Sequence, residues 1–248
     1  MAQPSYKHAP ITEAVIEISF ETPLSSAEIK KASEKFSSHY PQHQSVQNVK
    51  LAVAMPAGQK VKPTAEFVKG GEGHRRSTSD MAQLLVLWRS SFLISQLAPY
   101  PGWDDFFQRF VRDWKVWKRA VGFQTISRVG VRYINRIDIP ISESVVKYET
   151  FLNIYPKLPD ILGSVGTYAV QAGFPIEDIG CKLILNSAVV PSPILDHVSF
   201  IIDQDIIKEE DPPQKDEAIY ELLNEVRAIK NNVFEACITN PSRELFQR

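Results

Sequence analysis

The segment "SRVGVRYINRID", residues 127–138, carries arginines at positions 128, 132 and 136. A spacing of four suits one stripe of a helix, but valine, isoleucine, tyrosine and glycine fill the gaps, and a helix disfavours these residues. Alternate side chains of a strand share a face. One face then carries Arg128, Gly130, Arg132, Ile134 and Arg136, and the other, which suits burial, carries Val129, Val131, Tyr133, Asn135 and Ile137.

The segment "ITEAVIEISFE", residues 11–21, divides in the same way. Its apolar face holds Ala14, Ile16, Ile18 and Phe20, and its opposite face holds Glu13, Val15, Glu17, Ser19 and Glu21. If the two strands are neighbours, the acidic row meets the basic row, and each unlike pair contributes about 0.2–1 kcal/mol. The planar fork of arginine suits such pairing with a carboxylate.

The sequence therefore predicts a register device at the junction of these two strands, in which Arg128, Arg132 and Arg136 pair with Glu13 and Glu17. Two alternatives stay open. The arginines could remain unpaired on a concave surface and receive an anion, such as a phosphate or a carboxylate, or they could be ordinary solvated charges.

Further elements of the first half are predicted from residue types and from capping and turn-forming residues. Ser25 or Ser26 is expected to cap a helix that Pro41 stops. Three strands are predicted next, with a turn at "KGGEG" in the second; their sequences are "QSVQNVKLAVAMP", "TAEFVKGGEGHRRSTS" and "MAQLLVLWRSSFLISQLAP". The segment "GWDDFFQRFVRDWKVWKRAVG" predicts an amphipathic helix whose apolar stripe contains Trp114 and Trp117, so these indoles are expected in the core.

The second half repeats this order. After the strand at 126–140, "SESVVKYETFLNIYP" predicts a helix, and three strands are predicted from "GSVGTYAVQAGFP", "IGCKLILNSAVVP" and "DHVSFIIDQDIIKE". A long helix ends the chain, with an apolar face formed by Ala218, Ile219, Leu222, Leu223, Val226, Ile229 and Val233. We therefore predict an α+β protein of two β-α-β-β-β-α units, residues 1–122 and 123–248.

Two such units can join through their first strands into one curved, mainly antiparallel sheet with helices on one face. This topology resembles the duplicated saddle of the TATA-box-binding protein class, although the sequence carries no motif of that class. Two unrelated α+β subdomains are the alternative.

Three motifs, "PITEAVIEISF", "LAPYPGWDDF" and "SRVGVRYINRIDIP", together with the chain length, resemble an uncharacterised prokaryotic family of sporadic distribution. The resemblance implies no activity. Its patchy distribution suggests a mobile or defence-associated locus. The family motif falls on the residues that the face analysis selects, namely Glu13, Glu17, Arg128, Arg132, Tyr133, Asn135 and Arg136.

Bulk properties exclude several classes of protein. The formal net charge is -1, with 28 basic and 29 acidic residues, which argues against nucleic acid as a partner. The N-terminus lacks a secretory signal, and the apolar runs are shorter than a membrane span. Cys181 and Cys237 share no metal spacing and are expected as free thiols. A cytoplasmic protein is the expectation.

Motifs that could carry chemistry favour structural roles. "KGGEGHRR", residues 69–76, is expected as a mobile hairpin tip, because no Lys-Ser/Thr pair follows its glycines. His39 and His43 are expected on the surface, since Pro41 separates them. Asp203 and Asp205 share a strand face and could hold a divalent ion, but solvation of a strand end is favoured. No cofactor, metal or catalytic residue is predicted.

Two functions remain after these exclusions. The first is a non-catalytic binding or interaction protein whose open sheet face or loop tips engage a protein or a small anionic ligand. The second is an enzyme or sensor that binds a phosphorylated or nucleotide-like anion through Arg128, Arg132 and Arg136, with Glu13 or Glu17 as base.

Overall fold

The computed structural model describes residues 6–54, 64–141, 146–163 and 166–247, with the side chains of 48–70 and 160 left out. Its first half contains β1 (Ile11–Phe20), α1 (Ser26–Glu34), β2 (Gln42–Ala54), β3 (Thr64–Ser77), β4 (Gln83–Trp88), β5 (Ser91–Leu97) and α2 (Trp103–Val121). The second half contains β6 (Ile126–Pro140), α3 (Tyr148–Phe151), β7 (Ala169–Ile176), β8 (Cys181–Val190), β9 (His197–Lys208), α4 (Asp216–Cys237) and α5 (Asn240–Leu245).

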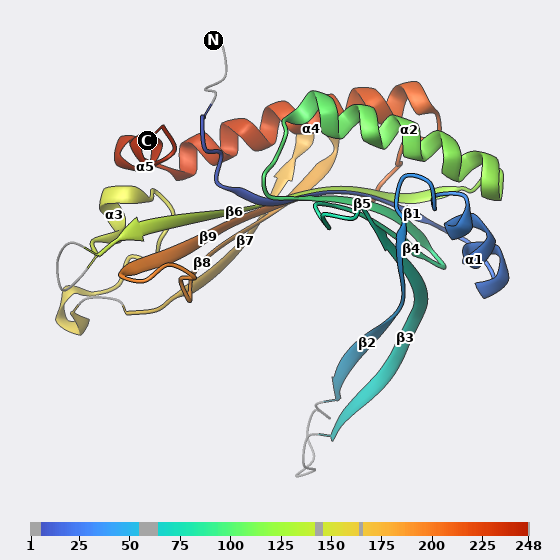
Figure 1. Cartoon of the computed structure of the whole chain (residues 1–248). Coiled ribbons are helices and arrows are strands. Elements are labelled where there is room, and N and C mark those ends of the chain that lie inside the picture. The colour runs from blue at the N-terminus through green and yellow to red at the C-terminus, as the bar shows by residue number, and fades with distance from the viewer. Residues whose placement is uncertain (1–5, 55–63, 142–145, 164–165, 248) are drawn as a thin grey trace.

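All nine strands of the described residues form one sheet, in the order β2-β3-β4-β5-β1-β6-β9-β8-β7, and every neighbouring pair is antiparallel. β1 and β6 are therefore neighbours, as the charge pattern predicts. The long helices α2 and α4 lie along one face of the sheet, and the strand pair β2–β3 projects away from them (Figure 1). The protein is α+β with a large antiparallel sheet and helices on one face.

The core lies between the sheet and α2 and α4. The alternation expected for the two central strands is confirmed, because the apolar face of β1 and the predicted inner face of β6 are buried: Ala14, Ile16, Ile18, Phe20, Val129, Val131, Tyr133, Asn135 and Ile137. Trp114 and Trp117 are also buried, and both stack on Phe20 of β1. Ser25 caps α1 in a capping box with Glu28, as its sequence predicts.

Three predictions about secondary structure are wrong in detail. The first half has four strands after its helix and not three, because the chain turns between Trp88 and Ser91 and divides one predicted strand into β4 and β5. β3 continues through "KGGEG", so these glycines form no hairpin tip. The predicted helix at 142–156 is confined to Tyr148–Phe151 within the described residues, and 142–145 lie outside them.

Gly73 has a packing role in β3. It lies opposite Trp88 of β4, and a Cβ at this position would approach the indole Cε3 to 2.4 Å and the Leu87 carbonyl oxygen to 2.9 Å. The indole therefore occupies the space that a side chain would fill. At Gly71, two residues earlier on the same strand, a Cβ would meet no atom within 4 Å.

We predict that Gly73→Ala lowers the free energy of unfolding by about 1–3 kcal/mol, because the new methyl group displaces Trp88 or bends the backbone. Gly71→Ala is the matched control and should change stability by less than about 0.5 kcal/mol. Urea denaturation of both variants measures the difference. Equal stability of the two variants would show that the indole does not lie over Gly73.

Candidate functional site

The open face of the sheet, opposite the helices, holds the predicted arginine row. Glu17 of β1 lies directly across from Gly130 of β6. Arg128 folds over Gly130, where a Cβ would lie 2.8 Å from its Nη1 atom. The same nitrogen donates to Glu17 Oε2 at 2.8 Å. Gly130 therefore leaves space for the side chain of Arg128, which forms an ion pair across the β1–β6 junction.

The other two arginines pair elsewhere. Arg132 lies across from Val15 but bonds Asp203 of β9, with Nε to Oδ1 at 2.8 Å and Nη2 to Oδ2 at 2.7 Å. The bond to Asp203 is the largest of the effects that raise the pKa of Arg132. Arg136 donates from Nε to Asp138 on its own strand at 3.0 Å. The prediction that the row pairs with Glu13 and Glu17 is thus correct for Arg128 and Glu17 only.

A hollow of about 240 Å³ on this face is lined by polar and apolar residues, among them Glu13, Glu17, Leu93, Arg128, Arg132 and Asp205. Its remaining glutamate, Glu13, accepts a hydrogen bond from Ser95. Burial raises the pKa of Asp205, and the nearby Arg128 and Arg132 oppose that rise. Carboxylates outnumber arginines in this lining, so the hollow offers no excess positive charge to an anion.

The remaining motifs have structural positions. Asp203 and Asp205 lie in the middle of β9 and not at a strand end, because each faces a β6 residue in register. His74 is buried in β3, which corrects the expected mobile tip, and its Nδ1 lies 3.0 Å from His43 Nε2. His39 and His43 are exposed, as predicted. No three His, Cys, Asp or Glu side chains of the described residues are placed to hold a metal ion.

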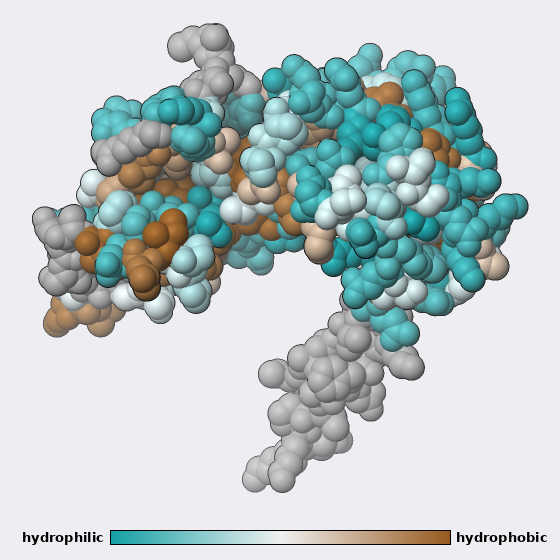
Figure 2. Space-filling view, viewed as in Figure 1, coloured by the Kyte–Doolittle hydropathy of each residue, from teal (hydrophilic) through white to brown (hydrophobic). Residues whose placement is uncertain are grey.

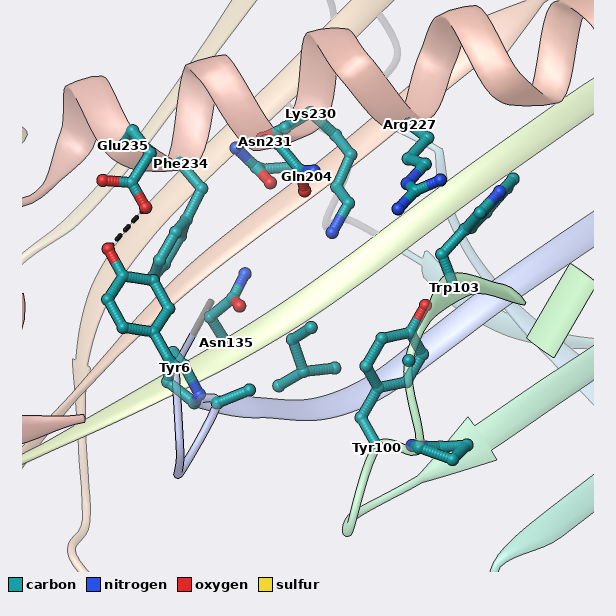
Figure 3. A pocket seen from close by; sticks show the side chains of 15 residues that line it. Tyr6, Tyr100, Trp103, Asn135, Gln204, Arg227, Lys230, Asn231, Phe234 and Glu235 are labelled. Atoms are coloured by element: carbon teal, nitrogen blue, oxygen red, sulfur yellow. Dashed lines mark hydrogen bonds between the residues drawn. The ribbon is translucent and has the colours of Figure 1, made fainter. Parts of the chain in front are cut away.

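A second pocket, of about 310 Å³, lies on the opposite, helix-covered face. It is bounded by the N-terminal segment, the loop before α2, β6, β9 and α4 (Figure 3). Its polar lining residues are Tyr6, Tyr100, Asn135, Gln204, Arg227, Lys230, Asn231 and Glu235. Of these, only Asn135 belongs to the positions that the sequence analysis selected, and there it was assigned to the buried face.

Lys230 is the most unusual residue of this pocket. Its side chain leaves α4 toward the sheet, only 9% of the residue is exposed, and its Nζ atom lies 3.7 Å from the ring centroid of Tyr133 (Figure 3). Within the described part of the chain no carboxylate pairs with this amine and no hydrogen bond reaches it, so its one charged neighbour is Arg227. Burial, assisted by the charge of Arg227, lowers the pKa of Lys230 to about 7.

An unsatisfied amide lies in the same pocket. Gln204 of β9 is 1% exposed, and its Nε2 donates to the Lys230 carbonyl oxygen at 3.2 Å. Its Oε1 is buried without a hydrogen-bond partner among the described residues. A buried polar atom without a partner costs about 1–3 kcal/mol, so a donor from a bound molecule would stabilise it.

Positive potential enters the pocket from two further sources. Arg227 points from α4 toward Lys230, 3.6 Å from the exposed carboxylate of Asp104 (Figure 3). The N-terminus of α2 begins at Gly102 without a side-chain cap, so its free N–H groups add a partial positive charge. Among the described lining residues the one carboxylate is Glu235, which is already bonded to Tyr6 at 2.6 Å and to Arg243 at 2.8 Å.

The sequence contains one signal for this pocket, in the apolar stripe of α4, that the predictions did not use. The buried face of α4 runs through Ile219, Leu223, Val226, Lys230 and Phe234, whereas Ile229 and Val233, which were expected on it, are only partly buried. A lysine four residues after one core position and four before another lies on the core side of the helix. Lys230 could have been selected on that ground.

No protein-family model matches the chain, and no curated protein matches it. No helix of the described residues has the length and apolar content that crossing a membrane requires.

We predict that Glu17→Arg lowers the free energy of unfolding by about 1–2 kcal/mol, because it places a second cation beside Arg128. Adding Arg128→Glu restores the pair and recovers much of the loss, whereas adding Arg136→Glu does not. Thermal or urea unfolding of the single and double variants measures this. Equal recovery by both second substitutions would contradict a specific Arg128–Glu17 pair.

We predict that Lys230→Met raises the free energy of unfolding at pH 6 by about 2–4 kcal/mol, because it removes a buried charge. Between pH 7 and about 10 the unfolded wild-type chain holds a proton that the native state has released, so wild-type stability rises with pH and the gain shrinks. Urea unfolding across this range measures it, with the exposed Lys115→Met as control. A gain that is independent of pH would contradict the lowered pKa.

Proposed function

We propose that this protein is a non-catalytic binding protein that holds a small anionic ligand in the pocket between α4 and the sheet. The observation that carries the proposal is the convergence of Lys230 and Arg227 on one cavity. Among the described residues that line it, the one carboxylate, Glu235, is bonded to Tyr6 and Arg243. The uncapped start of α2 adds to the same potential. A buried cation without a counter-ion is costly, and a bound anion relieves that cost.

The arginine row is a weaker candidate for the anion. Each of Arg128, Arg132 and Arg136 already bonds a carboxylate. A phosphate or nucleotide at this face would have to displace those carboxylates and would also meet Glu13 and Asp205. Binding there would therefore cost ion pairs, whereas binding beside Lys230 would create one.

A partner protein is a second candidate. Apolar surface gathers at the end of the sheet formed by β7, β8 and the segments beside them (Figure 2). Its large exposed side chains include Ile161, Leu162, Phe174, Ile194 and Leu195. Contiguous exposed apolar surface is typical of protein–protein contact sites, and this end of the sheet lies away from the helix-side pocket.

We further propose that the fold arose by duplication of one β-α-β-β-β-α unit, giving a saddle similar in topology to that of the TATA-box-binding protein class. Support comes from the strand order, in which β1 and β6 meet at the centre and each half continues outward from its own first strand. The two buried free thiols, Cys181 and Cys237, support a reducing, cytoplasmic location.

The anion site can be tested by calorimetric titration and thermal shift with acetate, lactate, phosphate and sulfate at pH 6. We expect at least one of them to bind and to raise the melting temperature. Arg227→Gln should weaken that binding about tenfold or more, because a charged hydrogen bond is lost.

Arg132→Gln is the matched control on the opposite face and should leave affinity unchanged. Loss of binding in Arg132→Gln with full binding in Arg227→Gln would move the anion to the arginine row. If none of the four anions binds the wild-type protein, the small-anion site is contradicted.

A further inference from the structure

Lys230 has a feature that anion binding alone does not use. The amine lies on the ring of Tyr133, is nine-tenths buried and has no carboxylate or hydrogen-bond partner among the described residues. A lysine that is desolvated and lies beside another cation keeps part of its population unprotonated at neutral pH, and the unprotonated amine is a nucleophile. Burial and Arg227 lower the pKa of Lys230 to about 7.

Two side chains of the pocket have different roles, since Arg227 is suited to bind an anion and Lys230 to act as a nucleophile. Arg227 stays charged at every physiological pH, so it can hold an anionic group whatever the state of Lys230. A lysine that loses its charge near neutrality is a poor permanent holder of an anion but a good nucleophile. Both side chains leave the same face of α4, three residues apart, and point into one cavity (Figure 3).

We propose that Lys230 captures its ligand covalently, as an imine, and that the ligand is a small carboxylic acid that also carries an aldehyde or ketone. This inference rests on the proposed function and names the ligand class of the same pocket. Arg227 binds the carboxylate and orients the carbonyl carbon toward the amine. The cavity of about 310 Å³ suits a ligand of this size.

The reaction balances without an oxidant or a reductant. The nitrogen lone pair of Lys230 forms a C–N bond to the carbonyl carbon, and one proton moves from nitrogen to the carbonyl oxygen, giving a carbinolamine. The second proton of the amine then moves to the hydroxyl oxygen, the C–O bond breaks, water leaves, and a neutral C=N bond remains. The step is reversible by hydrolysis, so the ligand can also be released.

The titratable groups that line the pocket with Lys230 are Arg227 and Glu235 of α4, Tyr100 before α2 and Tyr6 of the N-terminal segment; Tyr133 of β6 lies beneath the amine. Burial raises the pKa of Tyr100 to about 12 and raises that of Tyr133 well above its usual value, so both phenols stay protonated near neutrality. A change of capture between pH 6 and pH 8 therefore reports chiefly on Lys230.

The test is reductive trapping on the full chain. The protein is incubated with glyoxylate or pyruvate, cyanoborohydride is added, and intact-mass and peptide mass spectrometry locate the adduct, which adds the mass of the acid less one oxygen atom. Lactate, in which a hydroxyl group replaces the ketone of pyruvate, is the matched control ligand. Lys230→Met and Arg227→Gln are the test variants, and Lys115→Met, on the exposed side of α2, is the control variant.

We expect one adduct, on Lys230, that disappears in Lys230→Met, falls at least several-fold in Arg227→Gln and is unchanged in Lys115→Met. The yield of adduct should rise from pH 6 to pH 8, because imine formation needs the unprotonated amine. The affinity for lactate should fall over the same range, because the pocket loses the positive charge of the ammonium. Binding of pyruvate and lactate alike without an adduct would overturn the imine and leave the anion site standing. An adduct spread over surface lysines overturns the imine, and the absence of binding by any acid overturns both proposals.

Discussion

The pairing of β1 with β6 is the constraint on which the rest of the structure depends. It joins the two halves of the chain at the centre of the sheet, and its register places Glu17 opposite Gly130 and Ile16 opposite Val131. A shift of one residue would exchange the two faces of a strand, burying charges and exposing the core. The apolar face and the ion pair of Arg128 with Glu17 specify the same register, so burial and charge agree.

That register also creates two different surfaces from one strand. On the open face of β6 the arginines are neutralised by carboxylates from β1, β9 and β6 itself. On the helix side Tyr133 and Asn135 lie beneath α4, where Lys230 pairs with no carboxylate of the described residues. The charges that are conspicuous in the sequence are thus satisfied within the fold, and the charge that is unsatisfied lies under a helix.

Much of the fold could be predicted because it follows from short-range patterns. The period-two alternation of β1 and β6 gave their buried faces, and the stripe of α2 gave Trp114 and Trp117. The turn between β4 and β5 was missed because residues 88–91 contain no glycine, proline or asparagine. The glycines in β3 misled for the opposite reason, since Gly73 serves the packing of Trp88 and not a turn.

The site was predicted less well than the fold, because ion-pair partners are set by tertiary register. Arg132 and Asp203 are 71 residues apart, and only the β6–β9 pairing brings them together. The buried charges of α2 show the same limit. Arg109 and Asp113 lie on its inner side because Tyr40 lies between them, accepting a hydrogen bond from Arg109 and donating one to Asp113. Lys230 alone carried a local signal, its place in the buried stripe of α4.

Site-resolved NMR titration of the lysine side chains, followed through the ¹³Cε shifts, tests the account most directly. Lys230 should titrate near pH 7 in the free protein, as a resonance absent from Lys230→Met and well below the ordinary lysine pKa of about 10.4. A Lys230 that titrates near that ordinary value would mean that the amine is solvated or paired, and the site between α4 and the sheet would lose its physical basis.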